Sequence, residues 1–143
     1  MISAATLQGY RATTYAVTLP DQTVLGLRLG ETNPQADAYL RRQHAQNLIC
    51  LNAWNPQSRR LPVTRNMAAH QRLRRELGAL GYLALPQLGV PDRPTWRPEP
   101  GFAVPDLETK TAIALALRYG QFGIVRYRRG GIADLILTRL AVR

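Results

Sequence analysis

The sequence LICLNAWNPQSRR, residues 48–60, holds an apolar run that ends in aromatic and polar residues. Residues 48–53 predict a short strand, because short apolar runs bounded by turn residues are typical of strands buried in a sheet. Asn55 and Pro56 supply the turn signal that ends this strand. Trp54 and Asn55 therefore stand at the end of a core strand, which is a place where ligands often bind.

The segments on either side of this strand carry their own signals. Upstream, residues 10–19 and 24–29 predict a hairpin, and Asn33-Pro34 predicts the start of a helix that reaches about residue 43 or 44. Downstream, the chain predicts a helix capped by Thr64 and stopped by Gly81, followed by a strand over residues 82–85 or 82–88. A loop stiffened by five prolines leads to a short predicted strand over residues 101–104. The chain then predicts a helix capped by Asp106 and stopped by Gly120, and two strands over residues 121–127 and 132–140 joined by a tight turn.

This order of elements predicts an α/β or α+β fold. We expect a single domain over residues 1–143, with a mixed β-sheet, a hairpin at each end and about three helices packed on the sheet. The sequence shows no internal repeat and no linker. It leaves the strand order open.

Arginine dominates the charge of the chain. The formal net charge is +10, and only Lys110 among the 19 basic residues is a lysine. No acidic residue lies between Asp37 and Glu76, whereas eight arginines do. Such a surface attracts polyanions with an affinity that falls steeply with salt, so nucleic acid is a candidate partner. The alternative interpretation is that these arginines form a solvated face with no partner.

The remaining composition favours a cytoplasmic protein without a membrane partner. No apolar run approaches the ~20 residues that cross a bilayer, and the N-terminal residues lack the features of a secretory signal. The single cysteine, Cys50, has apolar neighbours and cannot form an internal disulfide. The sequence does not indicate an oligomeric state.

The helix predicted over residues 64–80 has two different ends. At 100° per residue, Leu73, Leu77 and Leu80 fall on one stripe, and Asn66 and His70 extend the same stripe towards the N-terminus. We therefore expect this helix to bury leucines at its C-terminal end and to turn an amide and an imidazole inwards at the other end.

Four pieces of the chain together resemble a known family. They are Ala53-Trp54-Asn55-Pro56, Asn66 just after a helix start, Trp96-Arg97-Pro98-Glu99, and Tyr119-Gly120-Gln121 followed by an apolar strand. In this order and spacing they resemble the bacterial family known as domain of unknown function 3293, over most of the chain. Phe122-Gly123 departs from the smaller residue and alanine usual in that family after the glutamine. The resemblance implies a compact domain with a shared site, and it supplies no activity.

Common catalytic and cofactor motifs are absent from the sequence. No pair among His44, His70 and Cys50 has metal-ligand spacing, and the glycine motifs that bind nucleotides or present a catalytic serine are missing. We therefore expect no metal and no cofactor. Nucleotide hydrolases, dehydrogenases and serine hydrolases of the common designs are disfavoured.

A composite polar site remains as the candidate. Glu99 and His70 are the candidate acid–base pair, because a carboxylate and an imidazole are the usual groups for proton transfer. The candidate ligand-binding residues are Trp54, Asn55, Asn66, Trp96, Gln121, Arg59, Arg60 and Arg65. Each of these residues also has a structural interpretation, as a packing anchor, a turn former or a solvated charge.

Three functions follow from these residues, in order of preference. The first is a binding module for an anionic ligand such as nucleic acid or a phosphorylated metabolite, in which tryptophan stacks on bases and arginines neutralise phosphates. The second is a metal-independent enzyme that uses Glu99, with or without His70, as acid or base. The third is an adaptor whose basic face binds an acidic protein.

Overall fold

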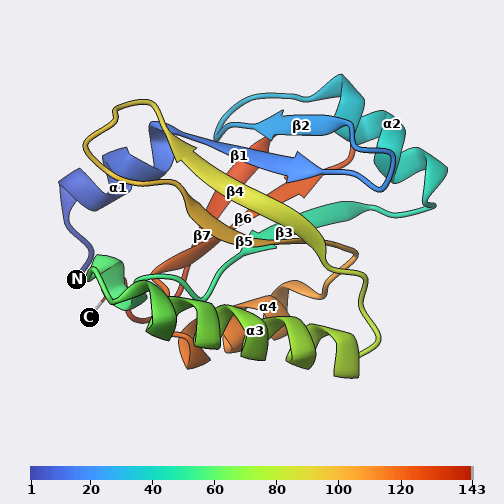
Figure 1. Cartoon of the computed structure of the whole chain (residues 1–143). Helices are drawn as coiled ribbons and strands as arrows, with labels where there is room; N and C mark the ends of the chain where they lie inside the picture. The colour runs from blue at the N-terminus through green and yellow to red at the C-terminus, as the bar shows by residue number, and fades with distance from the viewer. Residues whose placement is uncertain (143) are drawn as a thin grey trace.

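The computed structural model describes residues 1–142 and folds them around one seven-stranded sheet (Figure 1). The α-helices are α1 (Ala4–Arg11), α2 (Pro34–Arg42), α3 (Val63–Ala79) and α4 (Thr109–Arg118), and a short 3₁₀ turn, η1, covers Pro56–Ser58. The strands are β1 (Thr13–Thr18), β2 (Val24–Leu27), β3 (Asn47–Leu51), β4 (Leu85–Pro91), β5 (Glu99–Pro105), β6 (Gly123–Arg128) and β7 (Ala133–Leu137). They run in the order β2-β1-β4-β5-β3-β6-β7. The predicted fold class is confirmed, with a hairpin near each end of the chain. The strand pairs are antiparallel where a mixed sheet was expected, and residues 1–142 form four α-helices where about three were expected.

The sheet curls until its two edges touch. All six neighbouring strand pairs are antiparallel, and a parallel bridge joins Leu29, just after β2, to Ala133 in β7. The backbone N–H of Gly30 donates to the carbonyl of Ala133 at 2.8 Å. This closure pairs backbone groups that an open sheet would leave exposed along its edges. It also gives the sheet an enclosed inner face and an outer face.

Strand β3 is buried on both of these faces. Leu48 and Cys50 belong to the inner cluster of buried side chains, and Ile49 and Leu51 belong to the outer cluster. Because successive side chains of a strand point to opposite faces, a strand covered on both sides reads as a continuous apolar run. The run predicted from residues 48–53 is therefore the centre of the fold, and its alternation separates two cores.

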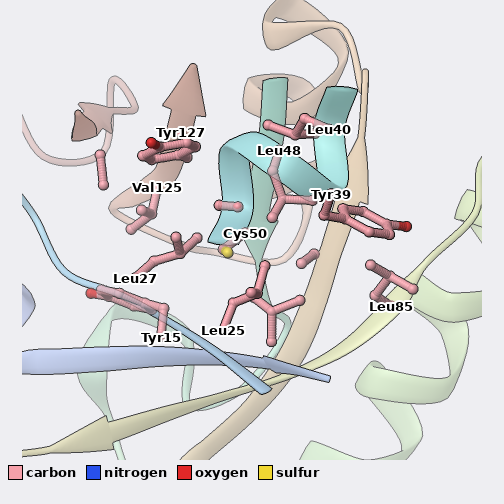
Figure 2. Close-up of a cluster of buried hydrophobic side chains, with 14 of the residues drawn as sticks. Tyr15, Leu25, Leu27, Tyr39, Leu40, Leu48, Cys50, Leu85, Val125 and Tyr127 are labelled. Carbon is pink, nitrogen blue, oxygen red and sulfur yellow. The ribbon is translucent and has the colours of Figure 1, made fainter. Parts of the chain in front are cut away.

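Different helices cover the two faces. Tyr39 and Leu40 of α2 pack into the inner cluster around Cys50, as Figure 2 shows. On the outer face, Leu73 and Leu77 of α3 belong to one buried cluster with residues of α4. Figure 1 accordingly shows α3 and α4 on one side of the sheet and α2 on the other.

The proline-rich loop is shorter than the sequence predicts. Pro86 and Pro91 lie within β4, and Pro100 lies within β5. Each proline lies just beyond the end of the pairing with one neighbouring strand. Pairing with β1 ends at Gln87, next to Pro86, and pairing of β4 with β5 ends at Gly89, before Pro91. Pairing of β5 with β3 ends at Phe102, so Pro100 is not paired with β3. A missing N–H therefore costs no ladder hydrogen bond on that side.

Two predicted helix caps are wrong. Thr64 lies inside α3, which begins after Pro62 without a side-chain cap. Asp106 does not cap α4, which begins after Glu108. Instead, the Asp106 carboxylate accepts hydrogen bonds from the backbone N–H groups of Gln46 and Asn47, at 2.8 and 3.2 Å. The Asp106 carboxylate therefore binds backbone N–H groups at the start of β3 instead of those at the start of α4.

The predicted leucine stripe of α3 is correct for two of its three members. Leu73 and Leu77 are fully buried, whereas Leu80 is 55% exposed. Leu80 is the C-terminal cap residue of α3, and Gly81 then turns the chain away with φ of +86°. The helix therefore ends before Leu80 can reach the outer core.

Packing against β5 leaves no room for a side chain at position 101. A Cβ at Gly101 would lie 2.7 Å from the carbonyl oxygen of Leu51 and 2.8 Å from both the Asn52 Cβ and the Gln87 Oε1. We expect Gly101→Ala to lower the free energy of unfolding by about 1–3 kcal/mol through overpacking.

The matched control is Gly78→Ala in α3, where no atom of residues 1–142 outside the local helix backbone lies within 4 Å of the added Cβ. This change should raise the free energy of unfolding by up to about 1 kcal/mol. Urea denaturation measures both, and equal effects of the two changes would contradict the prediction.

Candidate functional site

A pocket of about 400 Å³ opens beside the ends of β1, β4 and β5, under helix α1. Four of the predicted site residues line it: Asn55, Trp96, Glu99 and Gln121. The other lining residues are Ala5, Thr6, Gly9, Tyr10, Thr13, Tyr15, Asn52, Ser58, Gly89 and Pro91. Glu99 is the only one of these residues with an acidic or basic side chain, so the lining contains no arginine and no lysine.

Strand register places Glu99 on the inner face of the sheet. Tyr15 in β1 pairs with Gly89 in β4, and Gly89 pairs with Glu99 in β5. Cross-strand partners share a face of the sheet, and Tyr15 belongs to the inner cluster. Because Gly89 has no side chain, the space between the tyrosine and the carboxylate stays open. The pocket is thus the unfilled end of the curled sheet.

Two N–H donors hold one oxygen of the Glu99 carboxylate. The Trp96 indole Nε1–H donates to Glu99 Oε2 at 2.7 Å, and the Asn55 Nδ2–H donates to the same oxygen at 2.9 Å. Among residues 1–142, no donor is bonded to Oε1, and this atom is not among the buried polar atoms that lack a partner. Oε2 is therefore fixed by the protein, and Oε1 is available to the pocket.

A pair of asparagines orients this arrangement. Asn55 adopts the left-handed conformation (φ 45°, ψ 66°), which asparagine tolerates better than most residues. Its backbone N–H donates to Asn66 Oδ1 at 2.9 Å, and Asn66 Nδ2 donates to Asn55 Oδ1 at 2.8 Å. The backbone N–H of Leu61 also donates to Asn55 Oδ1, at 3.0 Å. Since Oδ1 accepts twice, Nδ2 of Asn55 must be the group that faces Glu99.

Gln121 is oriented by the same logic. Its Nε2 donates to the backbone carbonyls of Trp54 and Tyr119, at 3.1 and 3.2 Å. In the opposite orientation of the amide, Oε1 would face two carbonyl oxygens, and two acceptors do not form a hydrogen bond. Nε2 therefore faces the carbonyls, and Oε1 is free to accept a hydrogen bond from another group. Gln121 follows Gly120, whose φ of +70° turns the chain from α4 towards β6. The side chain thus joins the end of β3 to the start of β6 at the pocket wall.

Burial shifts the proton equilibria of the pocket. It raises the pKa of Glu99, and the hydrogen bonds from Asn55 and Trp96 lower it in part. Burial also raises the pKa of Tyr10 to about 12, with a further contribution from the negative charge of Glu99. For Tyr15 the pKa is raised as well, first by burial. The tyrosines thus stay neutral at physiological pH, and the carboxyl holds its proton to a higher pH than an ordinary glutamate does.

His70 lies apart from this pocket. Its ring stacks on Phe102 with a centroid distance of 4.4 Å and meets the Trp54 ring edge-on at 6.1 Å. Phe102 belongs to the outer cluster, whereas Glu99 faces the inner side. Burial, followed by the charge of Arg74, lowers the pKa of His70. The structure therefore does not bring His70 and Glu99 together as an acid–base pair.

Trp54 and Asn66 support the pocket without lining it. The Trp54 carbonyl accepts the hydrogen bond from Gln121, and Asn66, which is 2% exposed, bonds to Asn55. Their contribution to the geometry is indirect, through the side chains that they hold.

The arginines chosen from the sequence are all exposed. Arg60 covers the Trp96 ring, with its Cζ 4.5 Å from the ring centroid, and its Nη2 donates to the carbonyl of Thr95 at 3.2 Å. Arg59 is adjacent in the chain, and Arg65 lies on α3. Arginines of the acid-free segment also lie on α2, on the other side of the sheet (Figure 1). The predicted basic segment is therefore split between two surfaces.

Sequence reasoning missed helix α1 and the tyrosines beneath it. The strand predicted over residues 10–19 begins at Thr13, and α1 occupies residues 4–11. Ser3 caps this helix by accepting a hydrogen bond from the Thr6 N–H at 3.0 Å, and such a serine is a signal that can be found in a sequence. No residue of α1 is buried, so the helix carries no apolar stripe that periodicity could detect.

Residues 1–142 contain no group of three or more His, Cys, Asp or Glu side chains placed to hold a metal ion. Within the same range, no helix is both long and apolar enough to span a bilayer.

The raised pKa of Glu99 makes stability depend on pH. Between the ordinary pKa of glutamate and the raised value, the folded state binds more protons than the unfolded state, so Glu99 makes stability fall as pH rises through this interval. Glu99→Gln removes this effect while keeping an oxygen that accepts from Trp96 and Asn55. We expect the variant to gain stability relative to the wild type as pH rises through that interval, measured by denaturant unfolding at several pH values. Glu108→Gln, at an exposed position, is the control, and a parallel pH response of all three proteins would contradict the prediction.

Comparisons with known proteins identify a family and nothing finer. A search of curated proteins and a search of solved structures each returned no match to this chain. A family model described as Protein of unknown function (DUF3293) matches residues 51–124, which is more than half of the chain. The match runs from the last residue of β3 into β6 and includes Asn55, Glu99 and Gln121; it is narrower than the resemblance in the sequence implies. The chain belongs to this family of proteins of unknown function.

Proposed function

We propose that the domain binds a small organic ligand in the pocket and that Glu99 exchanges a proton with this ligand, without the help of a metal ion. The observation that carries the proposal is the asymmetry of the Glu99 carboxylate in the pocket wall: two N–H donors bind Oε2, and no donor of residues 1–142 binds Oε1. The pocket volume of about 400 Å³ lies within the range of small-molecule sites.

The position of the proton follows from these hydrogen bonds. An oxygen that accepts from Trp96 and Asn55 is a poor place for a proton, so the neutral carboxyl carries its proton on Oε1. That atom donates when Glu99 is neutral and accepts when Glu99 is ionised. The same atom thus serves as acid or base towards a ligand in the pocket.

The environment of Glu99 favours this chemistry over a simple ion pair. No salt bridge involving Glu99 is present within residues 1–142, and burial raises its pKa. Since an acid–base catalyst works best when its pKa lies near the working pH, an upward shift suits glutamate to proton transfer. The neighbours of the carboxylate are N–H donors, which orient a carboxylate and do not ligate metals.

The lining also bears on the charge of the ligand. A carboxylate without a basic neighbour repels a phosphate, so a purely anionic ligand does not suit the interior of the pocket. The ligand atoms that meet ionised Glu99 are neutral or positively charged groups with N–H or O–H donors. The preference for an anionic ligand suggested by the composition thus applies to the surface and not to the pocket interior.

A ligand screen tests the proposal. Wild type, Glu99→Gln and Glu108→Gln are to be compared by thermal shift against a library of small metabolites. Ligands that stabilise the wild type should lose about tenfold or more in affinity with Glu99→Gln, because a hydrogen bond to a charged group contributes roughly 1.5–3 kcal/mol. For a ligand that is turned over, Glu99→Gln should lower kcat by about 10²–10⁴-fold.

The control variant Glu108→Gln should bind every such ligand as the wild type does. The proposal fails if the ligands found by the screen bind equally well to Glu99→Gln, or if carboxyl NMR shows Glu99 titrating at the ordinary glutamate pKa.

Binding of a polyanion to the surface is a second candidate function. All eight arginines between Asp37 and Glu76 are exposed, and none forms a salt bridge within residues 1–142. Arg65, Arg72 and Arg75 lie at helical spacing on α3 and are free to neutralise phosphates. Arginines that contact phosphates bind nucleic acid by its charge and do not distinguish one base sequence from another.

Fluorescence anisotropy with single- and double-stranded DNA and RNA tests this second function. If each of the three α3 arginines neutralises one phosphate, replacing them with glutamine should reduce the slope of log affinity against log salt by roughly 2 to 3. The matched control replaces Arg41 and Arg42 of α2, on the other side of the sheet. A flat salt response of the wild type, or no binding at low salt, would rule the function out.

A further inference from the structure

We infer that the ligand of the pocket is a guanine nucleotide, with its base inside against Glu99 and Gln121 and its phosphate outside at Arg60. This inference rests on the proposed function of the pocket and adds the class of ligand to it. It depends on three separate features of the structure: the acceptors inside, the aromatic walls, and the arginines at the rim.

The interior presents hydrogen-bond acceptors on two sides. Glu99 Oε1 has no donor among residues 1–142, and Gln121 Oε1 has none either, because the Gln121 Nε2 is held by two backbone carbonyls. Both side chains line the same pocket. Asn55 and Trp96 hold the Glu99 carboxylate, and two backbone carbonyls hold the Gln121 amide, so both free oxygens accept hydrogen bonds when Glu99 is ionised. A ligand that meets both oxygens therefore carries at least two N–H or O–H donors.

The walls of the pocket are suited to a flat ring. Trp96, Tyr10 and Tyr15 all line it, and aromatic side chains stack on bases with useful energy whatever the base is. Gly89 and Gly9 contribute backbone without a side chain, which leaves width for a planar group. Sugars also carry donors, but they offer no flat ring to three aromatic side chains.

Exposed arginines lie next to two residues of the pocket wall, one of them in contact with Trp96. Arg60 lies on the Trp96 ring, 4.5 Å from its centroid, and is exposed. Arg59 and Arg97 are also exposed, and they follow the pocket residue Ser58 and the pocket residue Trp96 closely in the chain. Guanidinium groups bind phosphate through paired N–H donors. We assign an anionic group attached to the ring to Arg60, which contacts Trp96 and carries the charge opposite to that of Glu99.

Together, the acceptors, the aromatic side chains and the arginines favour a ligand with a flat, donor-bearing ring at one end and an anionic group at the other. One edge of guanine carries a ring N–H next to an amino group, so both groups donate to a carboxylate. A base whose amino group stands next to a ring nitrogen acceptor offers only one donor there. A nucleoside monophosphate adds one anionic end beyond the sugar. The positive net charge of +10 favours its approach. A small dication satisfies the interior but is repelled by this charge, and inorganic phosphate satisfies only the rim.

Calorimetric titration of the full chain with four probes tests the inference: guanosine monophosphate, inosine monophosphate, guanosine and ribose 5-phosphate. Guanosine monophosphate should bind about tenfold or more tightly than inosine monophosphate, which lacks the amino group, because the loss leaves a buried acceptor without a partner. It should also bind about tenfold more tightly than guanosine at low salt, and this second difference should shrink as salt rises.

Variants assign the two halves of the site. Arg60→Gln should weaken the nucleotide about tenfold and change guanosine little, as expected for a charge-assisted contact to phosphate; Arg41→Gln on α2 should change neither. Glu99→Gln should weaken both compounds. Equal losses for nucleotide and nucleoside in Arg60→Gln would show that Arg60 only holds Trp96 in place and would overturn the phosphate assignment.

The failure of this inference is distinguishable from failure of the proposed function. If ribose 5-phosphate binds as tightly as guanosine monophosphate and its binding depends on Glu99, or if neither guanine compound binds while another small molecule binds in a Glu99-dependent way, the nucleotide is wrong and the acid–base pocket stands. If no compound depends on Glu99, both are wrong.

Discussion

Strand β3 is buried on both faces, and the rest of the fold depends on this constraint. An apolar strand of this kind needs a core on each side. Leu48 and Cys50 take part in the inner core and Ile49 and Leu51 in the outer core. The inner core forms because the sheet curls until β2 and β7 meet at Leu29, and the outer core forms because α3 and α4 cover the convex side. Burial raises the pKa of the Cys50 thiol to about 12, which keeps this residue an inert part of the interior.

The site follows from the way this strand ends. A curled sheet cannot fill its open end with strands alone, and at that end the chain places an asparagine pair instead of apolar residues. Asn66, on the first turn of α3, holds Asn55, and Asn55 holds Glu99. Three segments that are distant in sequence are thus joined by side chains whose amide orientations are each determined by their partners. The carboxylate at the end of this chain of hydrogen bonds is fixed at one oxygen and open at the other, which is the kind of preorganisation that functional sites require.

Local patterns were sufficient to predict much of this arrangement. The two hairpins and the Asn33 cap are properties of short segments, and the structure has both hairpins, with shorter strands than predicted, and the cap at the predicted residue. Asn55, Trp96, Glu99 and Gln121 were also selected from the sequence alone, because Asn55 ends a predicted strand, Trp96 and Glu99 lie on the proline-rich loop, Gln121 opens a predicted strand, and all four belong to the motifs that resemble the family. The structure places all four around one pocket. The family match over residues 51–124 covers the same part of the chain.

Other features were decided only by the tertiary structure. Residues 10–11 read as part of a strand, yet they belong to a helix, because the packing of the sheet end and not local propensity sets where β1 starts. Prolines 86, 91 and 100 fit into strands because neighbouring strands stop pairing beside them, and register is a long-range property. The sequence offered His70 as a second acid–base candidate beside Glu99, and the structure stacks its ring on Phe102 of the outer cluster. The sequence alone determined the apolar centres of the strands and drew attention to the polar and aromatic residues beside them. Which face each side chain meets, and therefore which residues share the pocket, was decided by the curl of the sheet, because contacts between distant segments leave no periodic signal in the chain.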